Sequence, residues 1–207
     1  MAKFKIAIDV DETLIKKGSD WLEYINKLTG KQETLETLNV GNTLLNYAVD
    51  KSFKAKHPEY KDTDFSLFWR QHDLYDGDII DKQIIEVIES LNKDYNCDII
   101  FITGFMPEHM RSKFNLLQRS FPFLDLVSTD SDSAFIMTWQ KHHVNFDCLI
   151  DDRLVFFGKL KDKVLKIQID SPYSQEMPNH KLDLNSIKVD LKTTDWNQIK
   201  DFIVDLL

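Results

Sequence analysis

The chain of 207 residues lacks several features that would place it in a specialised class of protein. It has only two cysteines, too few for a disulfide framework. No apolar run approaches the ~18–20 residues that a membrane helix needs, and no signal-like apolar segment follows the first residues. We therefore expect a reducing, cytoplasmic location, buried and unpaired cysteines, and no association with a membrane.

The sequence also lacks an excess of basic residues. Asp and Glu number 34 against 26 Lys and Arg, which gives a formal net charge of -8. A stable nucleic-acid binder needs a basic footprint, so this class of function is disfavoured. A small anionic substrate stays open, because a bound metal ion reverses the local sign of the charge.

Apolar segments alternate between strand-like and helix-like patterns along most of the chain. Strands are expected at residues 4–8, 98–103, 146–150 and 164–169, with weaker candidates at 124–127 and 135–138. Helices are expected at residues 79–95, 107–121 and 196–207. This alternation predicts an α/β fold with a mostly parallel sheet flanked by helices.

Residues 16–78 interrupt the alternation, because their apolar positions have helical spacing only and aromatic residues are frequent between 53 and 75. An insertion of this kind after the first strand predicts a small helical cap. Residues 1–15 and 79–207 would then form the core domain.

Three acids follow the first predicted strand within four residues: Asp9, Asp11 and Glu12. Ligands of open α/β sheets bind beyond the carboxyl ends of the strands, and like charges held so close together need a cation. Mg²⁺ prefers carboxylates, carbonyls, waters and phosphate oxygens. The pattern therefore indicates a Mg²⁺ site that receives a phosphate, although a turn of solvated acids would explain these three residues alone equally well.

Two further strand ends carry suitable groups. Thr103 and Gly104 end the strand at 98–103 and would offer a hydroxyl and backbone N–H groups to phosphate oxygens. Asp151 and Asp152 end the strand at 146–150 and would add carboxylates to a metal shell.

The segment from Asp9 to Thr13 resembles motif I of the haloacid-dehalogenase (HAD) superfamily, Asp-Xaa-Asp-Xaa-Thr. The resemblance implies that Asp9 is the nucleophile, forms an aspartyl-phosphate and binds Mg²⁺. It implies that Asp11 first protonates the leaving group and then activates water, while its backbone carbonyl binds Mg²⁺.

The later strand ends resemble two other motifs of the superfamily. Thr103 matches motif II, in which the hydroxyl holds the phosphate. Asp151 and Asp152 match motif IV, which completes the Mg²⁺ shell, and which of the two binds the ion directly stays open. The motif III lysine is Lys141 or Lys113, and Lys141 is favoured because it lies ten residues before Asp151.

Within the superfamily the chain looks most like the 5'(3')-deoxyribonucleotidase group. The place of the insertion, the Phe65-Xaa-Xaa-Phe68-Trp69 segment and the Asp195-Trp196 pair carry this resemblance. It implies a nucleoside monophosphate substrate, with Phe65 and Trp69 among the candidates for contact with the base. The chain departs from the group at Glu12, where glycine is common, and after Thr103, where a Thr-Ser type of sequence is expected.

Other functions stay open at this point. The motif around Asp9 also resembles HAD phosphatases that act on phosphoserine tails, although an insertion of about 60 residues disfavours a bulky substrate. Removal of 3'-phosphates from nucleic-acid ends fits poorly with the net charge. A non-catalytic binding protein would be expected to have lost some of the motif residues, and none is lost. The oligomeric state stays open between a monomer and a homodimer.

Overall fold

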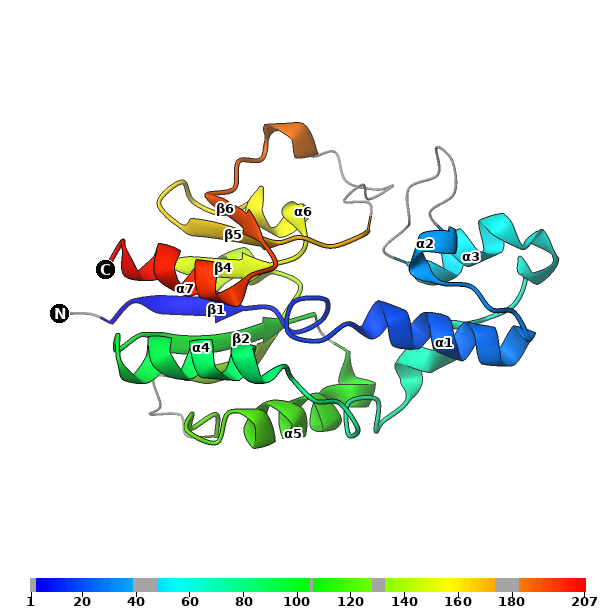
Figure 1. Ribbon diagram of the computed structural model, residues 1–207, viewed down its shortest axis with the longest axis horizontal. Coiled ribbons are helices and arrows are strands. Elements are labelled where there is room, and N and C mark those ends of the chain that lie inside the picture. Colours follow the sequence, from blue (N-terminus) through cyan, green and yellow to red (C-terminus); the bar gives the residue numbers. More distant parts are fainter. Residues whose placement is uncertain (1–2, 39–47, 105, 128–132, 174–182) are drawn as a thin grey trace.

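One parallel sheet organises the protein, whose computed structural model describes residues 3–38, 48–104, 106–127, 133–173 and 183–207. Its strands are β1 (Lys5–Ile8), β2 (Asp98–Thr103), β3 (Ala134–Met137), β4 (Cys148–Asp151), β5 (Leu165–Ile169) and β6 (Leu191–Thr193). They lie in the order β3-β2-β1-β4-β5-β6, and every neighbouring pair is parallel (Figure 1). The predicted α/β fold with a mostly parallel sheet is confirmed.

Two details of the strand prediction are wrong. Residues 124–127 form bends and irregular backbone rather than a strand. Leu124 is buried, Leu126 is partly buried and Val127 is exposed, so these apolar side chains share no buried face. Strand β6 was not expected, because three residues in the order Leu-Lys-Thr carry too short a pattern to distinguish a strand from a loop.

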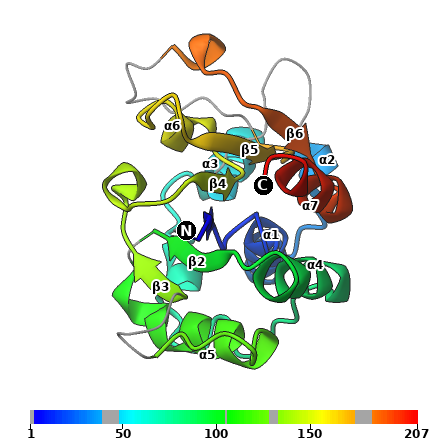
Figure 2. The ribbon, with the colours of Figure 1, turned by 90° about the vertical axis from the view of Figure 1, so that its left-hand side faces the viewer.

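Helices cover the sheet unequally on its two faces. Helices α4 (Lys82–Lys93), α5 (Met110–Ser120) and α7 (Trp196–Val204) pack on one face, and the short α6 (Leu154–Phe157) packs on the other (Figure 2). Helix α4 forms because Ile84, Val87, Ile88 and Leu91 recur at helical spacing and are buried, while the Asp81 side chain caps its first turn by accepting from the Gln83 N–H. Cys97 and Cys148 are buried and unpaired, as predicted.

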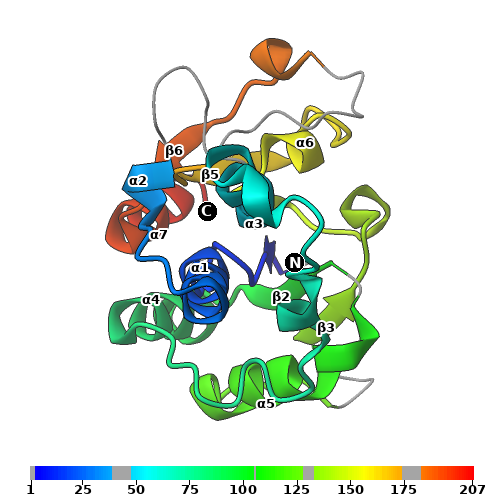
Figure 3. The ribbon, with the colours of Figure 1, turned by 90° about the vertical axis from the view of Figure 1, so that its right-hand side faces the viewer.

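Between β1 and α4 the described residues form helices and no strand. These elements are α1 (Lys17–Thr29), α2 (Leu35–Leu38), α3 (Val49–Lys56) and the 3₁₀ turns η1 (Pro58–Tyr60) and η2 (Ser66–Arg70). They lie beyond the carboxyl ends of the strands, on the opposite side from the two termini (Figures 1 and 3). Residues 39–47 of the expected helical insertion, which include Leu44 and Leu45, lie outside the described residues. The boundaries of a separate cap, 16–78, stay a prediction.

Two hydrophobic clusters show where the core sits. The larger cluster contains residues of β1 and β2, of α4, α5 and α7, and of α1, α3 and η2, so the same apolar core continues from the sheet into the helical insertion. The smaller one lies on the opposite face, under α6. Within the described ranges, no helix has the length and apolar character required to span a bilayer.

Candidate active site

The carboxyl ends of three adjacent strands bring the predicted motif residues together. In the sheet Ile8 pairs with Phe101 of β2 and with Ile150 of β4, and the Asp9 N–H continues the ladder by donating to the Ile150 carbonyl at 2.9 Å. Strand β1 is also the point from which the strand order runs in both directions, which is where open α/β sheets bind their ligands. Motif residues that are far apart in the sequence therefore form one cluster at the carboxyl edge of the sheet.

A buried lysine joins two of the acids. The Lys141 Nζ donates to Asp9 Oδ1 at 2.6 Å and to Asp151 Oδ2 at 2.6 Å, and the lysine side chain is 1% exposed. Burial raises the pKa of Asp9, Lys141 opposes this, and the net pKa of Asp9 is about 7. Burial lowers the pKa of Lys141, but Asp151 and Asp9 outweigh it, so the lysine pKa lies above its ordinary value. Lys141 is therefore a cation at neutral pH.

Asp152 has no such partner among the residues that the structure describes. Its side chain is fully buried, and neither carboxylate oxygen forms a hydrogen bond with a described residue. One ligand atom each from Asp9, Asp151 and Asp152 lie within 4.8 Å of one another. Burial, then Asp151 and Asp9, raise the pKa of Asp152 well above its usual range. A buried carboxylate left without a donor is costly, so this group requires a cation or a proton.

The donor set fits a divalent cation. If the three carboxylates are ionised, Lys141 balances one of the three charges and two negative charges remain. Carboxylate oxygens are the ligands that Mg²⁺ prefers. Asp151 is already bonded to Lys141 and accepts from the Arg153 N–H at 2.9 Å, whereas both oxygens of Asp152 stay available.

Asp11 lies in a different environment from Asp9. Its Oδ1 accepts from the Tyr75 hydroxyl at 2.7 Å, and its Oδ2 accepts from Lys113 Nζ at 2.6 Å and from Thr103 Oγ1 at 3.2 Å. Burial alone would raise the pKa of Asp11, but Lys113 and the Tyr75 hydrogen bond outweigh it and the pKa is lowered. The two aspartates of motif I therefore have pKa values shifted in opposite directions by their different surroundings.

Both candidate motif III lysines reach this site. Lys141 lies on Asp9, and Lys113 lies on Asp11 and also donates to Thr103 Oγ1 at 3.0 Å. Lys113 shares the buried face of α5 with Leu116 and Leu117. A charged residue at that spacing on an apolar helix face is a further sequence signal that supports Lys113 as a candidate functional residue.

Gly104 allows an aromatic ring to lie on the loop that follows Thr103. A Cβ atom on Gly104 would lie 2.4 Å from Cη2 of Trp139, so any larger residue would displace this ring. The Thr138 N–H donates to the Thr103 carbonyl at 2.8 Å, which holds the two loops together. Trp139 is 55% exposed and lies two residues before Lys141. The sequence analysis did not identify it, since an isolated Trp after a short strand carries no signal.

The two aromatic residues proposed to bind substrate have different surroundings. Phe65 is fully buried, with its ring 5.6 Å from that of Phe53, inside the helical insertion. Trp69 is half-buried, and its ring centroid lies 6.2 Å from that of His109, which begins the turn into α5. Trp69 therefore lies next to the start of α5, whereas Phe65 belongs to the packing of the insertion.

His109 is a further group that sequence reasoning missed. It is 1% exposed, and neither ring nitrogen forms a hydrogen bond with a described residue. Its ring lies 5.1 Å from the Tyr75 ring. Burial, followed by the charge of Lys113, lowers the pKa of His109 to about 4, so the imidazole is neutral at pH 7.

Glu12 occupies the position after Asp11 at which glycine is common in the 5'(3')-deoxyribonucleotidase group. Its backbone has φ 61°, the left-handed region that favours glycine. Its carboxylate accepts from the Gly18 N–H at 2.6 Å, in the first turn of α1, where negative charge is stabilising. Glu12 therefore joins the motif I loop to the first helix of the insertion.

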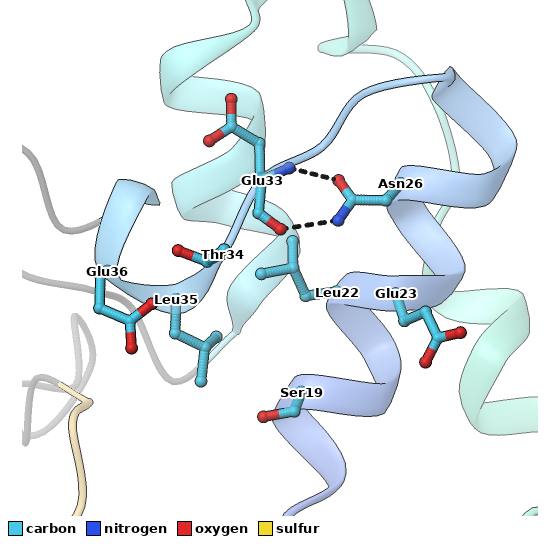
Figure 4. Close-up of a pocket in the computed structure, with 8 residues that line it drawn as sticks. All are labelled: Ser19, Leu22, Glu23, Asn26, Glu33, Thr34, Leu35 and Glu36. Atoms are coloured by element: carbon cyan, nitrogen blue, oxygen red, sulfur yellow. Dashed lines mark hydrogen bonds between the residues drawn. The ribbon is translucent and has the colours of Figure 1, made fainter.

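A separate hollow lies in the insertion between α1 and α2 (Figure 4). Asn26 holds its wall by donating to the Glu33 carbonyl at 2.7 Å and accepting from the Glu33 N–H at 3.0 Å. The residues that line it include three glutamates and no cation, and none of them belongs to the acid cluster. Such a lining repels a phosphate, so this hollow is not the substrate site.

Comparison with known proteins was made both by sequence and by structure. No protein-family model matches the chain. Two relatives named 5'(3')-deoxyribonucleotidase, from Bacillus subtilis (strain 168) and Bacillus phage SPbeta, are each 25% identical to it over 170 residues. The alignments cover 82% of this chain and 87% of each relative. The predicted resemblance to this group is confirmed.

Solved structures identify the fold. A HAD family hydrolase from Deinococcus radiodurans R1, with bound phosphate and sodium, matches with a TM-score of 0.56 at 11% identity, over 98% of this chain and 96% of that one. A protein from Burkholderia xenovorans LB400, assigned to the haloacid dehalogenase-like hydrolases, matches with a TM-score of 0.54 at 13% identity, over 99% of both chains. The chain therefore has the HAD fold that its motifs predict.

Proposed function

We propose that the protein is a Mg²⁺-dependent phosphomonoester hydrolase that acts through an aspartyl-phosphate on Asp9, with (deoxy)nucleoside monophosphates as its preferred substrates. The observation that carries the proposal is the buried cluster at the sheet edge. There Lys141 bridges Asp9 and Asp151, and the carboxylate of Asp152 has no hydrogen-bond donor among the described residues. The resemblance to 5'(3')-deoxyribonucleotidases supports the substrate class.

The residues of the site can carry out two successive phosphoryl transfers. An oxygen of Asp9 attacks phosphorus, the bond to the leaving oxygen breaks, and Asp11 gives that oxygen a proton. Asp11 then takes a proton from water, the water oxygen attacks phosphorus, and the bond to Asp9 breaks. Thr103, Lys113 and the Gly104 N–H would bind the phosphate oxygens during both steps.

The candidate metal ligands are Asp9, the backbone carbonyl of Asp11, Asp151 and Asp152. We assign direct contact to Asp152, because Asp151 already accepts from Lys141 and from the Arg153 N–H. Mg²⁺ bound there would supply positive charge that keeps the carboxylates ionised and neutralises the phosphate oxygens.

Metal binding is expected to stabilise the fold through Asp152. Mg²⁺ at a hundredfold excess over its Kd should raise the free energy of unfolding by about 2.7 kcal/mol, seen as a higher Tm. Asp152→Asn should remove most of this rise, and Asp170→Asn, at a surface ion pair with Lys192, should keep it. A Tm that rises equally in both variants would show that the cation binds elsewhere.

The base of a nucleotide is expected to contact Trp69 and Trp139 rather than Phe65. Trp139→Ala and Trp69→Ala should each lower kcat/KM for a nucleoside monophosphate by about 5- to 150-fold, the range that corresponds to ~1–3 kcal/mol of stacking. The same variants should change kcat/KM for deoxyribose 5-phosphate, which lacks the base, by much less. Equal losses on both substrates would contradict base stacking at these positions.

A screen of phosphate release tests the substrate class. The panel contains nucleoside 5'- and 3'-monophosphates, sugar phosphates and phosphoserine peptides, each with Mg²⁺ and with EDTA. The proposal predicts Mg²⁺-dependent release with the highest kcat/KM on a nucleoside monophosphate. A preference for phosphopeptides would favour the phosphoprotein alternative, and release that persists in EDTA would contradict the role of the metal.

A further inference from the structure

Tyr75 is a fully buried tyrosine outside the four HAD motifs that contacts the motif I aspartate. It lies in the return segment (residues 71–81), which leads from η2 back to α4. Its side chain is 0% exposed, and its hydroxyl donates to Asp11 Oδ1 at 2.7 Å. A residue at the border of the helical insertion therefore touches the group proposed to transfer protons.

The donors on Asp11 divide between its two oxygens. Lys113 and Thr103 both donate to Oδ2, and both are also proposed ligands of the substrate phosphate. A bound phosphate dianion is a competing acceptor for these two groups. Tyr75 donates to the other oxygen, Oδ1, and is not among the proposed phosphate ligands. Once substrate binds, Tyr75 is the described donor that stays available to orient Asp11.

Two buried lysines lie close to the ring of Tyr75. The Lys17 Nζ lies 5.0 Å and the Lys113 Nζ lies 4.8 Å from its centroid. Cations over an aromatic face are attracted to it, and more strongly when they are buried, as both lysines are here. The position of the hydroxyl is thus determined by α1 of the insertion and α5 of the core together.

The backbone around Tyr75 is fixed in the same way. Arg119 of α5 donates through Nη2 to the carbonyls of Tyr75 and Asp78, each at 2.8 Å. From α1, Lys17 donates to the Leu74 carbonyl at 2.9 Å and to the Asp78 carboxylate at 2.7 Å. The return segment is therefore anchored to both parts of the protein at the residue that touches Asp11.

We propose that Tyr75 is a positioning residue that orients the Asp11 carboxylate for proton transfer, so that proton transfer depends on how the return segment is anchored. The inference rests on the proposed function, because it gives Tyr75 a role only if Asp11 acts as acid and base. Tyr75 itself makes and breaks no covalent bond and transfers no proton to the substrate.

The leaving group provides the test. A nucleoside leaves as an alkoxide that needs a proton from Asp11, whereas p-nitrophenolate leaves without one. General acid catalysis contributes about 10²–10⁴-fold, so Tyr75→Phe should lower kcat/KM for a nucleoside monophosphate by about 10- to 100-fold. For p-nitrophenyl phosphate the loss should stay within about threefold, since the phosphate ligands and Asp9 are unchanged.

Two other variants complete the experiment. Tyr60→Phe removes a hydroxyl that donates to the Thr29 carbonyl in the insertion at 3.1 Å, and it should leave both substrates unaffected. Arg119 is exposed and donates to the Tyr75 carbonyl, so Arg119→Gln removes this hydrogen bond without altering the core. It should lower kcat/KM for the nucleoside monophosphate more than for p-nitrophenyl phosphate, by a smaller factor than Tyr75→Phe. It keeps the inference testable if Tyr75→Phe does not fold.

The possible failures can be told apart. Equal losses of kcat/KM on the two substrates, or no loss on either, would overturn the role of Tyr75 while leaving the hydrolase intact. Failure of the unmodified protein to hydrolyse either substrate with Mg²⁺ would instead overturn the proposed function, and the inference with it.

Discussion

Asp9→Asn is expected to abolish Mg²⁺-dependent hydrolysis of p-nitrophenyl phosphate, with a fall in kcat of about 10⁴-fold or more, as when other enzymes lose their nucleophile. An amide cannot form the acyl phosphate, and it withdraws one ligand from the cation. The variant should still fold. The Asp9 carboxylate is buried and its pKa is about 7, so replacing it with a neutral amide removes an unfavourable charge rather than a stabilising one.

The measurement is steady-state phosphate release, with Tm recorded on the same samples. Asp170→Asn is a suitable control, because its carboxylate is exposed and pairs only at the surface with Lys192. A kcat in Asp9→Asn within tenfold of the unmodified protein would rule out Asp9 as the nucleophile, whatever the metal dependence.

Lys141→Met is expected to damage both stability and activity. The substitution leaves Asp9 and Asp151 buried without the ammonium that lies 2.6 Å from each, and breaking a buried pair in this way costs about 3–5 kcal/mol. Activity should fall by at least about 10²-fold, the usual effect of losing one group that stabilises transition-state charge. Chemical unfolding without metal measures the first effect, and phosphate release with saturating Mg²⁺ measures the second.

The pH dependence of this loss has a definite sign. Without Lys141 the pKa of Asp9 rises further, so this acid becomes protonated in the folded state. The loss of stability should therefore be smaller at pH 5 than at pH 8, where keeping a proton on Asp9 is unfavourable. Lys192→Met, which removes a surface ion pair, should cost no more than about 1 kcal/mol at either pH. Equal effects of the two lysine variants would contradict a structural role for the buried bridge.

The sequence predicts most of this site because the chemistry lies at strand ends. Asp9, Thr103 and the pair Asp151–Asp152 each follow a short apolar run, and parallel strands bring their carboxyl ends to one edge. Helix α4 was equally predictable, because its burial follows the helical period and Asp81 provides a cap. Local pattern and tertiary structure agree at these positions.

The residues that were missed acquire their roles through tertiary contacts alone. Tyr75 is one aromatic residue among many in its segment until the fold places its hydroxyl on Asp11. Trp139 is notable only because Gly104, 35 positions earlier, leaves room for its ring. His109 is a buried histidine whose neighbours, Trp69 and Tyr75, come from the insertion and the return segment. None of these contacts has a periodic or short-range signature.

The account depends most directly on a covalent phosphoryl group at Asp9. The protein should be mixed with Mg²⁺ and substrate, quenched in acid during turnover, reduced with borohydride and digested for peptide mass analysis. Borohydride converts an acyl phosphate to an alcohol, so we predict homoserine at position 9, absent when substrate is omitted and absent in Asp9→Asn. Turnover without modification at position 9, or modification at another residue, would contradict the account.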